Sequence, residues 1–275
     1  MSAIAGPAPA VTTTQLWSSF LRAEWIKLTT VRSTLYTLAA AAVAAIGIGA
    51  ISCQRMVAEL SGTDAFRRLV LLHGFDASAR SLIGNILAQL AVGALGALIV
   101  TSEYGTGMIR ASLTAMPQRQ GWIAAKLAVF GAVALVVGQA LTFASFGVGQ
   151  AVLSIAHAGL SLSDPQALRT VVATGIYVSL VGLLGVGFGL IIRHTAGAIT
   201  TLIGTLFVLP AIVTALSQPL QGQVMRFLPS SIGEQAASID RLHDHFAPWA
   251  GIGLMVGYVA VVVAIGCVLL QRRDA

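Results

Sequence analysis

Residues 170–192 read TVVATGIYVSLVGLLGVGFGLII and contain no Lys, Arg, Asp or Glu. A helix needs about 20 predominantly apolar residues to cross the hydrocarbon core of a bilayer, which is about 30 Å thick. The chain holds five more charge-free segments of this kind, near 34–53, 82–101, 127–156, 196–216 and 248–270. Together the six segments predict an all-α integral membrane protein with six transmembrane helices.

The composition leaves room for little besides spans and connections. The chain has 275 residues, of which 56% are hydrophobic and 9% charged, and its mean hydropathy is +0.86. Soluble proteins carry about 25% charged residues, so we expect no folded soluble domain of the usual ~100 residues. Proton- and ion-coupled pumps usually keep ionisable residues inside the bilayer. Because the six segments have none, we expect the energy for any uphill transport to come from outside the chain.

The charge distribution predicts the topology. An even number of spans places both termini on one side of the membrane. If that side is the cytoplasm, nine of the 16 Lys and Arg residues lie inside and seven outside, as the positive-inside rule favours. We therefore expect a multi-pass protein of the cell (plasma) membrane with both termini cytoplasmic. The formal charge of +6 comes from residues beside the spans, where contact with anionic membrane lipid is expected and nucleic acid is not.

The segment before the first span, residues 15–33, reads QLWSSFLRAEWIKLTTVRS. Apolar residues recur in it at helical spacing, and the stripe includes Trp17, Phe20, Leu21, Trp25 and Leu28. Tryptophans with basic residues alongside, here Lys27, are typical of an amphipathic helix in the membrane interface. A helix packed on the protein's own spans is the alternative, and the two interpretations are compatible. Residues 1–14 are expected to form a disordered tail.

The longest polar stretch on the presumed cytoplasmic side is residues 103–126, EYGTGMIRASLTAMPQRQGWIAAK. Two glycines after Glu103 permit a sharp change of chain direction. A short helix with apolar character then ends before Pro117. Such a helix between two spans would act as a lever on both, and the opposite charges of Glu103 and Arg110 would allow these residues to pair. The alternative is a solvated loop whose basic residues only fix the topology.

This stretch carries the pattern E-Y-x-x-G-x-I-R from Glu103, then x-L-x-x-x-P-x-R, and a Lys that opens the next span. On these residues the chain resembles the permease subunits of ATP-binding-cassette transporters of the type-2 exporter class. The basic amphipathic FLRAEWIKLTTVRSTLY at 20–36, the six-span plan and Leu-Pro-Ser at 228–230 are also similar to that family. The resemblance covers most of the chain.

The resemblance implies a fold, a function and partners. Residues 34–275 would be a six-span permease domain, and residues 106–117 a coupling helix that docks on a separate nucleotide-binding ATPase subunit. Two permease copies, or two related permeases, would pair with two such subunits to export or flip a substrate such as a lipid or an amphiphilic drug. The outer loop 217–247 would hold short re-entrant helices. The coupling residues would be Glu103, Tyr104, Gly105, Gly107, Ile109, Arg110, Leu113, Pro117 and Arg119.

The chain itself lacks the motif that binds ATP. A P-loop needs Lys directly after Gly and before Ser or Thr, whereas the two lysines, Lys27 and Lys126, follow Ile26 and Ala125. We therefore expect no enzymatic activity and no cofactor in this chain. ATP and Mg²⁺ would be bound by the partner subunit.

Polar residues within the spans have two interpretations. Asn85 and Gln89 share one face of the second span, and Gln139 and Thr142 nearly do so in the third. These side chains would line a substrate pathway or form hydrogen bonds between helices. The tripeptide 243–245, His-Asp-His, has no further His or Cys close in sequence, so we expect a polar surface loop and no metal site.

Glycine and proline patterns predict how the spans pack. Gly185-x-x-x-Gly189 and Gly253-x-x-x-Gly257 are small-residue motifs typical of close helix contact in membranes. Pro210 predicts a kink in the fifth span.

Two other classes of function stay open at this point. One is an energy-independent channel or an ion-coupled carrier, although charge-free spans disfavour the carrier. The other is a non-transporting membrane scaffold or sensor. Dependence on ATP and a stable complex with an ATPase subunit would distinguish the permease from both.

Overall fold

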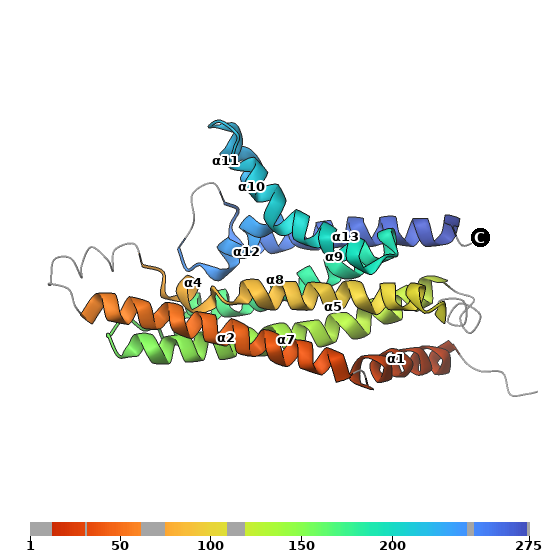
Figure 1. Ribbon diagram of the computed structural model, residues 1–275, viewed down its shortest axis with the longest axis horizontal. Helices are drawn as coiled ribbons and strands as arrows, with labels where there is room; N and C mark the ends of the chain where they lie inside the picture. Colours follow the sequence, from red (N-terminus) through yellow and green to blue (C-terminus); the bar gives the residue numbers. More distant parts are fainter. Residues whose placement is uncertain (1–12, 31, 62–74, 109–118, 241–244, 274–275) are drawn as a thin grey trace, which may run out of the picture.

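The computed structural model describes residues 13–30, 32–61, 75–108, 119–240 and 245–273. All regular structure in these ranges is helical, and the longest helices lie side by side along one axis (Figure 1). Six stretches of the described chain are long and apolar enough to cross a membrane. The chain is thus an all-α, multi-pass membrane protein, and the prediction of six spans is confirmed.

The spans are α2 (Arg32–Ser61), α5 (Asn85–Gly105), α7 (Arg119–Ser154), α8 (Pro165–Ile192), the α9–η1–α10 stretch (Thr195–Ile203, Gly204–Val208 and Leu209–Val213) and α13 (Pro248–Arg273). Four more helices are α1 (Thr13–Thr30), α4 (Ala77–Leu82), α11 (Leu220–Met225) and α12 (Pro229–Ala237). We name the two ends of the bundle the α1 end and the α4 end after the helices that lie there (Figure 1).

The boundaries differ from the predicted ones in two informative places. Helix α1 begins at Thr13, before the expected start at residue 15. Helix α7 begins at Arg119, two turns before the apolar segment, and therefore includes Lys126. Residues 1–12 of the predicted tail, and residues 109–117 of the predicted coupling helix, lie outside the described residues.

Helix α8 has clear start and stop signals. The Asp164 carboxylate accepts the backbone N–H of Gln166 at 2.8 Å, and Pro165 fills the first turn, where its missing N–H costs nothing. At the other end Arg193 adopts a left-handed conformation, φ 60°, and donates its N–H to Gly189 O at 2.9 Å. Arg193 and His194 then connect α8 to α9, and the His194 side chain caps the N-terminus of α9 by accepting the backbone N–H of Gly197. These signals explain why the predicted spans end and begin close to these residues.

Helix α8 is the centre of the bundle. Within its most apolar window 72% of the residues are buried, against 17% in α2 and 22% in α13. It packs against α5, α7 and α13 along its length. The outer spans therefore present most of their apolar surface away from the protein, as expected of helices that face lipid or another membrane protein.

Backbone contact between α5 and α8 depends on glycine. A Cβ atom on Gly96 would meet the carbonyl oxygen of Gly182, and a Cβ atom on Gly185 would meet that of Gly93. The predicted Gly185-x-x-x-Gly189 motif therefore packs against α5. Nothing in the described chain lies within 4 Å of a Cβ placed on Gly253 or Gly257, so the second motif makes no close contact within it.

The segment 217–240 contains α11 and α12, and of these α12 packs against α8 and α13. Gly233 of α12 packs on the ring of Tyr177, which a Cβ on Gly233 would overlap at 2.5 Å. Tyr177 lies twelve residues after Pro165, or about 18 Å along α8. The described part of the predicted outer loop thus contains two short helices, one of which reaches deep along α8.

Replacing Gly185 with leucine should destabilise the protein, because the side chain would meet a backbone carbonyl that cannot move away. We expect a loss of about 3 kcal/mol, the upper end of the range for overpacked sites. The measurement is the melting temperature of the purified protein in mild detergent. Gly257→Leu is the matched control in open space, and equal melting temperatures for the two variants would contradict the α5–α8 packing.

Candidate functional site

Four charged side chains from three helices meet at the α1 end of the bundle. Glu24 and Lys27 come from α1, Glu103 from the last turn of α5, and Lys126 from the third turn of α7. Glu24 bridges the two lysines, with 2.8 Å from Oε1 to Lys27 Nζ and 2.7 Å from Oε2 to Lys126 Nζ. Glu103 Oε1 accepts from both lysines, at 2.9 and 2.8 Å. We call these four residues the ion cluster.

The cluster is buried at its centre. Lys126 is only 2% exposed, and Glu24 and Glu103 are buried as well, while Lys27 is half-buried at the edge. The ammonium of Lys126 donates to Glu24, to Glu103 and to the carbonyl oxygen of Ile99 at 3.2 Å. All three of its protons thus have acceptors, and the ring of Trp122 lies 5.1 Å away. Such complete pairing is what makes a buried charge tolerable.

The edge residue Lys27 keeps its charge firmly. Partial burial opposes that charge, but the hydrogen bonds and attraction from Glu24 and Glu103 outweigh it and raise the pKa of Lys27 above its ordinary value. Lys27 therefore stays positively charged throughout the neutral pH range.

The apolar residues of α1 form two neighbouring rows with different surroundings. Phe20 and Leu28, in one row with Glu24, pack on the core that contains Trp122. Trp17 and Trp25 form the second row and are exposed, Trp25 to 52%. Helix α1 thus packs on the spans through one row and leaves two indole rings outside, so the described contacts agree with both predicted interpretations.

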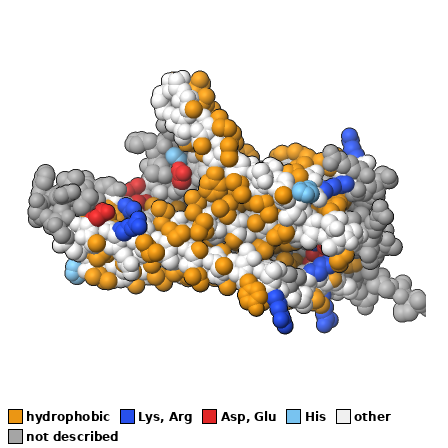
Figure 2. Space-filling view, in the orientation of Figure 1, with side chains coloured by type: hydrophobic (Ala, Val, Ile, Leu, Met, Phe, Trp, Pro, Cys, Tyr) orange, Lys and Arg blue, Asp and Glu red, His pale blue; other side chains and the backbone are white. Residues whose placement is uncertain are grey.

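The α1 end also gathers basic side chains on its surface. Figure 2 shows a mostly hydrophobic and uncharged middle of the visible face, with Lys and Arg toward the ends and mostly at the α1 end. Such a distribution is what the positive-inside rule expects of a cytoplasmic side.

The structure brings together some predicted coupling residues and leaves others untested. Glu103 lies in the ion cluster, and the described partners of its carboxylate are lysines; the expected partner Arg110 lies outside the described residues, as do Ile109, Leu113 and Pro117. Tyr104 packs at the edge of the core, with the Arg193 guanidinium 5.0 Å from its ring. Gly107 has a φ of 72°, a left-handed conformation that favours glycine, so the chain turns sharply here as predicted.

The sequence pattern did not predict that Glu24 and Lys126 pair in the cluster. Glu24 lies four residues after Phe20 and four before Leu28, so it shares the packed face of the helix. A carboxylate in an apolar row, in a chain with only two lysines, was the available signal. Its buried partner Lys126 lies 102 residues further along the chain, beyond what local spacing reveals.

The polar residues predicted inside the spans make bonds between or within helices. Gln139 Nε2 donates to Val172 O of α8 at 3.0 Å, and Thr142 donates to Gly138 O of its own helix at 2.7 Å. Asn85 Oδ1 accepts from Ser145 of α7 at 3.5 Å, and Gln89 is half-buried. These contacts favour the packing interpretation over a pathway.

No metal centre is found in the part of the chain that the structure describes: no three His, Cys, Asp or Glu side chains gather there. His243 and Asp244 lie outside that part. His245 Nε2 lies 3.7 Å from Glu234 Oε2.

Comparison with protein-family models gives no match to this chain, and comparison with curated proteins gives none either.

Lys126→Met should destabilise the protein by about 3–5 kcal/mol, because it leaves buried carboxylates short of a cation. The double variant Glu24→Gln/Lys126→Met removes one charge of each sign, so we expect it to be less destabilised than the two single effects added together. Melting temperatures in mild detergent provide the measurement. Arg22→Met, at an exposed position of α1, is the control, and strictly additive losses would contradict the cluster.

The raised pKa of Lys27 predicts a pH dependence. A cation whose pKa is higher in the folded state stabilises the fold at pH values below its ordinary pKa, and this contribution is lost as pH rises through the folded value. We expect Lys27→Gln to lower the melting temperature at pH 8, and the difference from the wild type to shrink above about pH 10.5. Arg22→Gln, which removes a cation outside the ion cluster, is the control and should show a constant difference. A constant difference for Lys27→Gln would refute the assignment.

Proposed function

We propose that the chain is the permease subunit of an ATP-binding-cassette transporter, and that it exports or flips a substrate with ATP hydrolysed by a separate subunit. The α1 end faces the cytoplasm, and the chain works as a pair of permease copies or with a related permease. A single observation carries this proposal. Glu103 and Lys126 of the ion cluster lie at the two ends of the segment 104–125 and are bonded to each other.

The cluster brackets the segment that would dock on the ATPase. Glu103 lies at the beginning of this connection and Lys126 at its end, and the two side chains are bonded at 2.8 Å. Both also bind Glu24 or Lys27 of α1. A displacement of residues 106–117 would therefore act on α1, α5 and α7 together, since breaking a buried ion pair is costly.

The glycine contact extends this mechanical path. Helix α5 carries Glu103 at one end and meets the backbone of α8 through Gly93 and Gly96. Rigid elements in direct contact transmit displacements without a flexible step between them. Movement at the cytoplasmic end would thus reach the central helix of the bundle, which is what alternating access requires.

Three further features support the proposal. The sequence has no P-loop, and both of its lysines are bound in the cluster, so ATP must be hydrolysed elsewhere. The six apolar segments predicted from the sequence contain no Lys, Arg, Asp or Glu, unlike the spans of ion-coupled pumps. The little-buried outer faces of α2 and α13 suit contact with lipid and a second permease.

The first experiment is purification of the tagged chain in mild detergent with mass spectrometry of what accompanies it. We expect a P-loop ATPase at close to one copy per chain, lost when residues 106–117 are replaced by a Gly/Ser linker. Replacement of residues 243–245, in the connection between α12 and α13, is the matched control. Recovery of the chain alone across several detergents would overturn the proposal and favour a self-contained channel or a scaffold.

The coupling role has a sharper test in the assembled complex. Arg110→Glu should insert normally but uncouple transport from ATP hydrolysis, because it reverses a charge in the docking segment. Glu103→Gln should leave the ATPase bound and lower transport per ATP hydrolysed, since it weakens the link between the segment and α1. Normal transport by both variants would contradict coupling through this region.

A further inference from the structure

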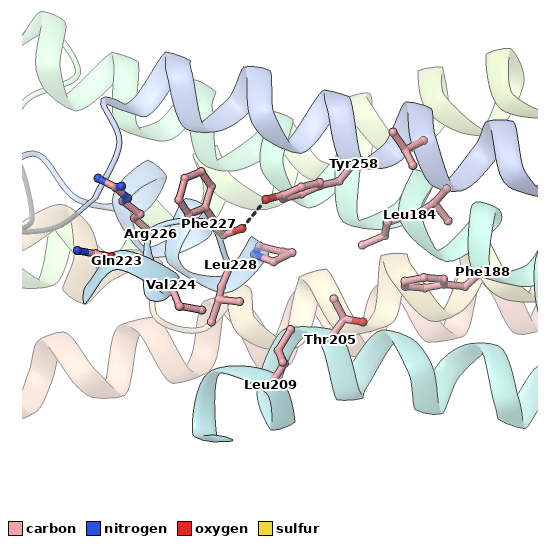
Figure 3. A pocket seen from close by; sticks show the side chains of 13 residues that line it. Leu184, Phe188, Thr205, Leu209, Gln223, Val224, Arg226, Phe227, Leu228 and Tyr258 are labelled. Carbon is pink, nitrogen blue, oxygen red and sulfur yellow. Dashed lines mark hydrogen bonds between the residues drawn. The ribbon is translucent and has the colours of Figure 1, made fainter. Parts of the chain in front are cut away.

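A pocket of about 780 Å³ opens in the side of the bundle between α8, α13 and the α9–η1–α10 stretch, with α11 and the chain after it at one end. Its volume is within the range of ligand sites, about 300–1,000 Å³. The apolar part of its wall includes Leu184, Phe188, Leu209, Phe227 and Val261. Figure 3 shows Phe188 at one end of the pocket and Arg226 with Gln223 at the other. We call it the lateral pocket.

The path of the fifth span creates this space. Residues Gly204–Val208 form a π-helical turn, and Pro210 follows in the first turn of α10; both features redirect a helix. Helices α10 and α11 consequently project away from the bundle (Figure 1). The kink predicted from Pro210 is therefore part of a larger bend. The hydroxyl of Tyr258 donates to Phe227 O at 2.7 Å and fixes the returning chain against α13.

The pocket is accessible from the side that a bilayer would occupy. Val261 is 58% exposed, and Leu209 and Phe227 are exposed as well. Tyr258 lies ten residues after Pro248, about 15 Å along α13 and thus near the middle of that span. An occupant would enter from the hydrocarbon region of the membrane, where acyl chains are the most abundant ligands.

The polar end of the pocket carries a positioned cation. The Arg226 guanidinium lies 5.1 Å from the ring of Phe227 and 5.7 Å from that of Phe246, and these two rings pack edge to face at 5.1 Å. In the described ranges no carboxylate forms an ion pair with Arg226. A guanidinium stacked on aromatic rings keeps its donors directed outward, and its fork matches the oxygens of a phosphate.

We propose that the lateral pocket binds an anionic phospholipid, with an acyl chain along Leu184, Phe188 and Val261 and the phosphate at Arg226. Apolar walls with one cationic end match the two parts of such a molecule. The inference goes beyond the proposed transport function and does not depend on it, because it requires only that the chain spans a membrane.

The test uses the full-length chain alone, without an ATPase, in nanodiscs that contain phosphatidylglycerol with a photoreactive group on the acyl chain. Labelled peptides are mapped by mass spectrometry. We expect labels to concentrate on residues 184–188 and 258–262, and Val261→Trp, which fills the pocket, to reduce labelling there to the level of a lipid-facing helix. Val43→Trp on α2, where the side chain is 74% exposed, is the matched control and should leave pocket labelling unchanged.

The headgroup is tested separately with Arg226→Gln. We expect the wild type to prefer phosphatidylglycerol over diacylglycerol with the same chains by about tenfold, the scale of a charge-assisted hydrogen bond, and the variant to lose this preference. Arg80→Gln, at an exposed position on α4, should retain it. Both pocket variants alter exposed side chains and should keep the wild-type melting temperature.

Three outcomes would overturn the proposal. Labels spread evenly over the exposed faces of α2 and α13 would show ordinary lipid contact only. A preference for phosphatidylglycerol that persists in Arg226→Gln would remove the phosphate site. Cross-links from the pocket to a second copy of the chain would show that protein covers it. None of these results affects purification with an ATPase, so failure here and failure of the proposed function are distinguishable.

Discussion

The interaction on which the α1 end depends is the bonding of Lys126 to Glu24 and Glu103. An ammonium group that is 2% exposed is stable there only because carboxylates from two other helices and a backbone carbonyl surround it. Since Glu24 and Lys27 belong to α1, that helix cannot detach without breaking the ion pairs of Glu24 with Lys126 and of Lys27 with Glu103. Helix α1 is therefore part of the packed bundle and at the same time exposes two tryptophans, Trp17 and Trp25.

The spans could be predicted from sequence because the constraint that produces them is local: a bilayer demands a minimum run of apolar residues. The limits of α8 were also predictable, since Asp164, Pro165 and the turn at Arg193 act on neighbouring residues only. The ion cluster could not be predicted, because its members are brought together by the packing of three helices. The two glycine motifs share the same spacing, yet Gly185 packs on α5 whereas no described atom lies within 4 Å of a Cβ placed on Gly257. The spacing alone therefore could not predict which motif makes a contact.

Helix α8 connects the two regions that carry the proposals. One side of it shares a core with Trp122 and Leu95 beside the cluster-bearing helices, through Val178, Val186 and Leu190. Its Leu184 and Phe188 line the lateral pocket. A shift of α8 relative to α5 would therefore move Leu184 and Phe188 in the pocket wall. A molecule bound in the pocket would in turn affect how α5 and α8 pack.

The order of the elements along the chain has a consequence for biosynthesis. The ion cluster is built entirely from α1, α5 and α7, all of which leave the ribosome before α8. Its charges can therefore neutralise one another early, while the glycine face of α5 still lacks the helix that covers it. Until α8 has been inserted, the nascent protein has a complete ion cluster but an uncovered glycine face on α5. A membrane chaperone would protect this face during that interval.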